Sequence, residues 1–151
     1  MKRKKIIRYI VLPLLLLITV AAAYIYKEYN RTHKDTAKLK PDYALTATGL
    51  LKEFETNEQA SNTKYWDKVL RVEGAVKELD RDDKGFYSII IGDTASMSSV
   101  RCSMDSAHNT EAAGLKKGMP VAVKGICTGY NSDALLGSDV ILVRTVVDGK
   151  K

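Results

Sequence analysis

The chain has 151 residues and a net charge of +6, a length that suits one ordinary domain with an accessory segment. A basic balance is typical of nucleic-acid-binding proteins, but here the charge is uneven along the chain. Residues 1–33 contain seven Lys/Arg and one acidic residue, whereas the remaining residues contain 17 basic and 17 acidic side chains. The main domain is therefore neutral, and its charge argues against a nucleic-acid partner.

The first recognisable element is an uncharged, mostly apolar run at residues 9–26. At about 1.5 Å per residue, a helix of this length spans about 27 Å, close to the hydrocarbon thickness of a bilayer. Five of the first eight residues are basic, and positive residues stay in the cytoplasm. We therefore expect a single-pass membrane protein with a cytoplasmic tail at residues 1–8 and an extracytoplasmic C-terminal domain. The alternative is a cleaved signal peptide, with Ala21-Ala22-Ala23 as the cleavage site.

Residues 27–42 are polar, contain Pro41 near their end and are predicted to form a linker. Asp42 is a favourable N-cap residue for a helix. Apolar residues at spacings of three and four follow it, which predicts a helix over residues 43–64 with one buried face. Asn57 lies inside this stretch, and we expect it to weaken the helix or divide it.

From residue 69 the apolar spacing changes to strict alternation, which is typical of a half-buried strand. Alternation predicts strands at 69–77, 98–104 and 119–128, whereas a stretch rich in aromatic and β-branched residues predicts a strand at 86–91. A short helix at 106–115, a polar loop at 129–138 and a strand at 139–147 complete the predicted order. Five strands with a helix between the third and the fourth match the OB-fold barrel. The sequence therefore predicts a mainly β, α+β domain over residues 43–148, in which an α-helix precedes a five-stranded OB-fold barrel.

Several short stretches also resemble a known protein family. They are Asn57-Glu58-Gln59-Ala60, Tyr65, Val72-Glu73-Gly74-Ala75-Val76, Lys117-Gly118 and Val121-Ala122-Val123-Lys124-Gly125-Ile126-Cys127-Thr128-Gly129. In this order and spacing they resemble the tRNA_anti-like family of OB-fold proteins, over residues 43–147. The resemblance implies a small bacterial protein, often with an N-terminal membrane anchor or signal. The family has no agreed catalytic residues, so the resemblance implies none here.

Nucleic-acid binding by an OB fold needs a basic groove and aromatic side chains on which bases stack. The second and third predicted strands offer Phe86, Tyr87 and Arg101, and one of the two aromatic residues has to fill the core. The polar loop adds Tyr130 and Asn131, which suit contact with a sugar or a peptide, unless the loop is an ordinary connector. Our candidate ligand-binding residues are Phe86, Arg101, Tyr130 and Asn131, and the expected partner is a protein or an oligosaccharide rather than nucleic acid.

The two cysteines, Cys102 and Cys127, both point to the predicted interior by strand alternation. Outside the cytoplasm a disulfide between them is possible, although it requires close Cα atoms, and two buried free thiols are the alternative. The sequence lacks the paired spacing of zinc ligands, so no metal is expected. His108 is the one histidine of the predicted domain, and its polar surroundings favour a surface position over a catalytic one.

Together these features predict a membrane-anchored, extracytoplasmic OB-fold module that binds a ligand, without enzymatic activity and without a cofactor. A protein that binds single-stranded nucleic acid is the alternative, since OB folds commonly bind oligonucleotides.

Overall fold

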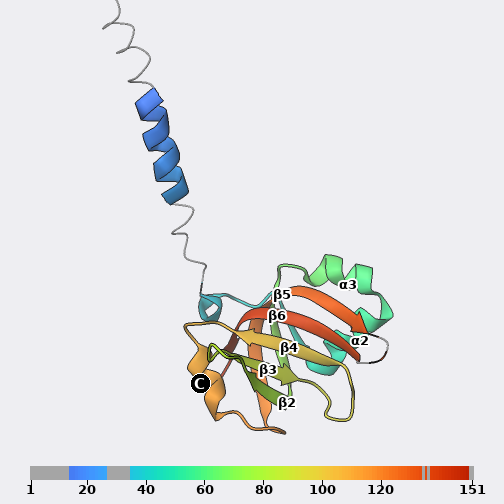
Figure 1. Ribbon diagram of the computed structural model, residues 1–151. Helices are drawn as coiled ribbons and strands as arrows, with labels where there is room; N and C mark the ends of the chain where they lie inside the picture. The colour runs from blue at the N-terminus through green and yellow to red at the C-terminus, as the bar shows by residue number, and fades with distance from the viewer. Residues whose placement is uncertain (1–13, 27–34, 134, 136, 150–151) are drawn as a thin grey trace, which may run out of the picture. The chain divides into compact units, whose positions relative to one another are not determined.

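Figure 1 shows the computed structural model, which describes residues 14–26, 35–133, 135 and 137–149. The chain divides into two compact units, Met1–Lys34 and Asp35–Lys151. The second unit contains all of the strands that the structure describes.

In the first unit, residues 14–26 are helical, and their large apolar side chains are exposed. Within the described residues, no helix is both long enough and apolar enough to cross a membrane. The predicted tail at 1–8 and the beginning of the predicted span at 9–26 lie outside the part of the chain that the structure describes.

The second unit contains six strands, two α-helices and two 3-10 helices among its described residues. In chain order they are η1 (Thr36–Lys38), β1 (Tyr43–Thr46), α2 (Ala47–Thr56), α3 (Glu58–Tyr65), β2 (Val69–Arg81), β3 (Tyr87–Ile91), β4 (Ser99–Met104), η2 (Asn109–Gly114), β5 (Pro120–Asp133) and β6 (Gly137–Val147).

The strands form one sheet in the order β1-β2-β3-β4-β6-β5, and β5 also pairs with β2 (Figure 1). This last pairing closes β2 to β6 into a ring, so the five predicted strands are confirmed. β4 and β6 are parallel, whereas the other pairs in the ring are antiparallel. β1 is an additional strand, parallel to β2.

The core lies inside this ring, because strand alternation directs every second side chain inward. Leu70, Val72 and Val76 of β2 are fully buried, as the alternation predicts. Gly125 of β5 lies at a register shift against β6, where a Cβ atom would come within 2.7 Å of Thr145 Oγ1. Glycine is therefore required for the close approach of the two strands. The helix α2 adds Leu50, Leu51 and Phe54 to the core.

The helix predicted over residues 43–64 is wrong in its first four residues, which form β1. Thr46, not Asp42, caps the helix, because its hydroxyl accepts a hydrogen bond from Gly49 N at 3.1 Å. The Asp42 carboxylate accepts instead from Val69 N at 2.9 Å and so begins the pairing of β1 with β2. The predicted division at Asn57 is confirmed, since its side chain caps α3.

The loop predicted at residues 129–138 is also wrong over most of its length. β5 continues to Asp133 and β6 begins at Gly137, so the strands form a long hairpin. The polar residues of this region face outward along paired strands, and their composition hides the pairing. The short helix predicted at 106–115 is the 3-10 helix η2.

Part of the predicted linker belongs to the second compact unit, which begins at Asp35. The side chain of Thr36 in η1 is fully buried, and Lys124 Nζ donates to the Ala37 carbonyl at 2.7 Å. Residues 27–34 of the predicted linker lie outside the described part of the chain.

Candidate functional site

Two of the sequence candidates, Arg101 and Asn131, lie on the same outer surface of the ring, on opposite sides of β6. In the strand register Arg101 of β4 pairs with Ile141 of β6, and Ser99 pairs with Asp139. On the other side of β6, Asn131 of β5 pairs with Asp139. We call the surface formed by Trp66, Arg101, Asn131, Asp139 and Ile141 the Trp66 face.

Trp66 lies at the edge of this surface, directly after α3, and its side chain is 57% exposed. A Cβ atom built on Gly129 would be 3.9 Å from the indole ring, so the ring lies over the glycine of β5. Gly129 pairs with Ile141, which places the tryptophan beside the centre of the Trp66 face.

The backbone around Trp66 is held by three hydrogen bonds: Trp66 N to Asn62 O at 2.9 Å, Asp67 N to Cys127 O at 2.9 Å, and Lys68 N to Tyr65 O at 3.1 Å. Asp67 has a positive φ of 58°. Such a conformation is costly for a residue with a side chain and persists only where the surroundings impose it. The exposed indole is therefore carried on a fixed turn.

The charges on the Trp66 face are paired. Arg101 Nη2 lies 3.5 Å from Asp139 Oδ2, and the Ser99 hydroxyl donates to the same carboxylate. The Arg101 side chain is still 42% exposed, and Asn131 is exposed on the other side of β6. The surface therefore offers an aromatic ring, an amide and a paired guanidinium, without an excess of positive charge.

A hollow of about 400 Å³ lies next to Arg101 and Asp139. Two lysines line it, but Lys77 Nζ already donates to the Ser96 and Ser98 carbonyls at 2.7 and 3.0 Å. Its lining consists of Lys77, Glu78, Ile90, Thr94, Met97, Ser99, Arg101, Lys117 and Asp139.

The other two sequence candidates do not join this surface. The Tyr130 ring stacks on Phe54 at a centroid distance of 5.0 Å and packs against the core. Phe86 is 41% exposed, but it lies in the turn before β3, where its N–H donates to Asp82 Oδ1 at 2.8 Å. The residue of β3 that pairs with Arg101 is Ile90, four residues after Phe86, so Phe86 lies away from the Trp66 face.

Sequence reasoning missed Trp66, Asp139 and Ile141. The available signal was the tryptophan itself, since it is the only one in the chain and stands next to a polar helix end. Nothing local identifies Asp139 or Ile141, because their role follows from the position of β6 between β4 and β5.

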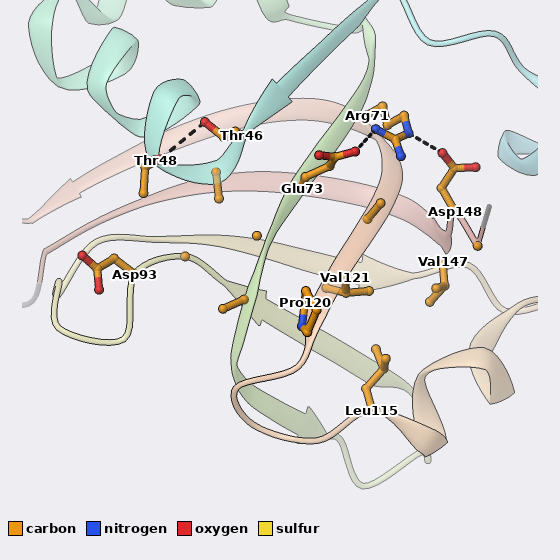
Figure 2. Close-up of a pocket in the computed structure, with 16 residues that line it drawn as sticks. Thr46, Thr48, Arg71, Glu73, Asp93, Leu115, Pro120, Val121, Val147 and Asp148 are labelled. Atoms are coloured by element: carbon orange, nitrogen blue, oxygen red, sulfur yellow. Dashed lines mark hydrogen bonds and ion pairs between the residues drawn. The ribbon is translucent and has the colours of Figure 1, made fainter.

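A second surface is the larger groove in Figure 2, which we call the Arg71 groove; its volume is about 690 Å³. It lies over the outward side of β2 and β5, where Glu73 pairs with Ala122 and Ala75 pairs with Pro120. Its lining consists of Thr46, Ala47, Thr48, Arg71, Glu73, Gly74, Ala75, Gly92, Asp93, Leu115, Pro120, Val121, Ala122, Val147, Asp148 and Gly149.

Arg71 lies between two carboxylates on the rim of the groove, as Figure 2 shows. Its Nη1 donates to Glu73 Oε1 and its Nε donates to Asp148 Oδ2. Hydrogen bonds to Glu73 and then Asp148 raise the pKa of the guanidinium, which stays charged. With Asp93, the lining contains three acidic residues and one basic residue.

Both cysteines are buried free thiols, which is the second of the two possibilities that the sequence left open. Cys102 and Cys127 each pair with Leu142, from opposite sides of β6. Two strand spacings of about 4.8 Å separate their Cα atoms by roughly 9–10 Å, and a disulfide needs less than about 7 Å. Burial raises the pKa of both thiols.

His108 has a carboxylate at each ring nitrogen. Nδ1 lies 2.6 Å from Glu111 Oε1, and Nε2 lies 3.0 Å from Asp35 Oδ1. The hydrogen bond to Glu111, followed by that to Asp35, raises the pKa of His108 above its usual value. Among the described residues, no group of three or more His, Cys, Asp and Glu is placed to hold a metal ion.

One solved structure shares this fold. A crystal structure of a lipoprotein from Klebsiella pneumoniae subsp. pneumoniae MGH 78578, provisionally described as nucleic acid-binding, is 16% identical with a TM-score of 0.55. The match covers 79% of this chain and 100% of that one. A crystal structure provisionally described as an aspartyl-tRNA synthetase from Leishmania major Friedlin is 9% identical, with a TM-score of 0.45. The match covers 88% of this chain and 26% of that one.

No curated protein matches the chain. The family model described as tRNA_anti-like, however, matches residues 1–144, which is most of the chain. The ring of five strands, β2 to β6, with η2 between β4 and β5, is consistent with an OB fold. The chain therefore belongs to the tRNA_anti-like family.

Proposed function

We propose that this protein is a membrane-tethered, extracytoplasmic binding module without enzymatic activity, and that it binds a neutral oligosaccharide on the Trp66 face. The observation that carries the proposal is the exposed indole of Trp66, held on a fixed turn beside the paired charges of Arg101 and Asp139.

The tether is supported by residues 9–26, which contain no charged residue, and by the basic cluster that precedes them. Residues 14–26 are helical and expose their apolar side chains, an arrangement that is unfavourable in water and favourable in a lipid environment. The positive charges before the helix favour a cytoplasmic N-terminus and an extracytoplasmic domain.

The ligand class follows from the chemistry of the Trp66 face. An aromatic ring offers a large apolar surface at low entropic cost, on which the C–H face of a sugar can stack, while amide and charged groups bind its hydroxyls. Asn131, Asp139 and Arg101 lie within reach of a ligand that extends from the indole across β5, β6 and β4. OB folds bind oligosaccharides as well as oligonucleotides.

A single-stranded nucleic acid suits this surface less well, because it requires a basic groove. The Arg101 charge is compensated by Asp139, and Lys77 is held by two carbonyl groups. The second compact unit, Asp35–Lys151, contains 16 basic and 17 acidic residues, so it carries no excess of positive charge.

Since Trp66 is the only tryptophan, its fluorescence reports directly on the proposed site. The intact protein in detergent would be titrated with chitotetraose, cellotetraose and maltotetraose, and in parallel with dT12 and rU12. We expect a saturable change in fluorescence with at least one of the neutral sugars. Isothermal titration should give the same affinity for the wild-type protein and for Phe86→Ala, an exposed aromatic residue outside the Trp66 face.

The Trp66→Ala variant should lose at least about tenfold in affinity, since aromatic anchors dominate such sites. Two results would reject the oligosaccharide: no saturable binding to any neutral sugar, or unchanged affinity in Trp66→Ala. Strong binding to dT12 or rU12 that weakens with salt would establish the nucleic-acid alternative instead.

Topology is tested separately by fusing a phosphatase that is active only outside the cytoplasm after residue 151. We expect activity, and an inactive phosphatase together with an active cytoplasmic reporter at the same position would invert the proposed orientation.

A further inference from the structure

The Arg71 groove is separate from the Trp66 face and shares no residue with it. Its hollow arises from small side chains at outward positions of two paired strands. Ala75 and Pro120 face each other across β2 and β5, and Ala122 follows beside Glu73. Large residues at these positions would fill the space, so the groove depends on a run of small side chains.

The size and walls of the groove suit a small organic molecule. Its volume of about 690 Å³ lies within the range of roughly 300–1,000 Å³ that ligand pockets occupy. Leu115, Val121 and Val147 provide an apolar wall opposite the start of α2 (Figure 2). The interior therefore favours a compact apolar body.

The rim determines the charge of the ligand. Arg71 is the one basic residue in the lining, its side chain is only 18% exposed, and it contacts one oxygen of Glu73 and one of Asp148. The two carboxylates exceed its charge by one, and Asp93 adds a further negative charge. Electrostatic complementarity therefore favours a cation over a neutral molecule, and a neutral molecule over an anion.

We infer that the Arg71 groove binds a small organic cation, with an apolar body on the floor of Ala75, Pro120 and Ala122 and an ammonium group at Glu73 and Asp148. This site goes beyond the proposed oligosaccharide function and does not depend on it.

Three probes that share one ring system and differ in charge test the inference: 2-(1-naphthyl)ethylamine, 2-(1-naphthyl)ethanol and 1-naphthaleneacetate. The full chain in lipid nanodiscs would be titrated with each by calorimetry, and empty nanodiscs would give the lipid background. We expect the amine to bind about tenfold more tightly than the alcohol, and the acetate to bind most weakly, because a charged hydrogen bond contributes that much.

Two variants connect the binding to the groove. The double change Glu73→Gln with Asp148→Asn should bring the amine down to the affinity of the alcohol, and Ala122→Trp should abolish binding of all three probes by filling the hollow. Glu78→Gln is the matched control, since Glu78 is an acidic residue of the same strand outside the groove. Thermal unfolding would establish that each variant is folded.

The inference is overturned if the acetate binds as tightly as the amine, if none of the probes binds above the lipid background, or if a folded Ala122→Trp variant retains full affinity. Trp66→Ala should leave amine binding unchanged, so failure of the oligosaccharide proposal and failure of this inference give different results.

Discussion

The Trp66 face and the Arg71 groove are two outer surfaces of the same ring of strands, and β5 contributes to both. One is an open surface with an exposed aromatic ring and a balanced ion pair, whereas the other is a hollow with an apolar floor and an acidic rim. The second compact unit contains 16 basic and 17 acidic residues, yet the ligands that we propose for the two surfaces differ in charge, one neutral and one cationic. The comparison teaches that a nearly neutral domain can present surfaces of different local charge, because the pairing of charges differs between them.

Both surfaces lie on strands that pack around one interior, and the reactivity of the two buried cysteines measures how well that interior is packed. Cys102 and Cys127 are buried and carry raised pKa values, so we expect native alkylation to be slower than in the unfolded chain by on the order of a thousandfold. Titration with a thiol reagent should find two thiols per chain in denaturant and almost none in the native protein. A chain without free thiols in denaturant would show that the disulfide forms.

The boundary between the Trp66 face and the core is tested by two aromatic residues. Tyr130→Ala should lower the free energy of unfolding by about 2–3 kcal/mol, because its ring stacks on buried Phe54. Trp66→Ala should cost less than about 1 kcal/mol, because its ring is mostly exposed. Urea unfolding measures both, and equal losses would mean that Trp66 is a core residue and not a ligand-binding one.

One arginine from each surface, Arg71 and Arg101, provides a second comparison of stability. Arg71→Met removes hydrogen bonds to Glu73 and Asp148 and leaves two carboxylates close together, so we expect a loss of about 1 kcal/mol. Arg101→Met removes one exposed ion pair and should change stability by no more than about 0.5 kcal/mol. If Arg101→Met proves the more destabilising, the Arg101–Asp139 pair is structural rather than available to a ligand.

Stability, but not ligand binding, should respond to pH near neutrality, since neither surface contains a histidine. Asp35 and Glu111 raise the pKa of folded His108 above its unfolded value of about 6.5. Its contribution is therefore complete below the unfolded pKa and is lost as pH rises through the folded pKa. Compared with His108→Gln, the wild type should lose about 0.5 kcal/mol across this window.

Denaturation between pH 5.5 and 8.5 measures this loss of stability. Lys38 lies 3.7 Å from Asp35 and stays unchanged in both proteins. His33→Gln is the control, because it removes the other histidine of the chain. An identical pH profile in His108→Gln would exclude His108 as the titrating group.

The sequence predicted the five strands of the ring from local signals, which are alternation in strands such as β2 and β4 and the aromatic and β-branched content of β3. It failed at β1 because residues 43–46 are a strand only through pairing with residues 70–73, far along the chain. Their apolar spacing fits the start of the following helix equally well. Likewise, Asn131 was assigned to a polar loop and Asp139 to the start of the last strand, although the two are partners across a hairpin.

The candidate site was predictable only in part. Arg101 was chosen as an outward strand residue and Asn131 as a residue of the predicted polar loop, and the structure places both on one outer surface, on opposite sides of β6. Tyr130 was chosen for its aromatic ring, but a bulge between Cys127 and Gly129 turns that ring inward onto Phe54. The Arg71 groove results from small residues that face each other on two paired strands. No single stretch of sequence predicts it, because the pairing joins residues that are far apart in the chain.

The attachment of η1 has a mechanical consequence for the membrane tether that we propose at the N-terminus. Tension on the tether would reach Asp35 first and break its contact with His108, then the bond from Lys124 to Ala37. These contacts break one after another, so this segment yields under small forces. The hydrogen bond between Asp42 N and Val69 O follows, and beyond it β1 shares the load along β2. Release of residues 35–42 would add a segment with a fully extended length of about 27 Å to the tether and would leave the ring of strands and its two surfaces intact.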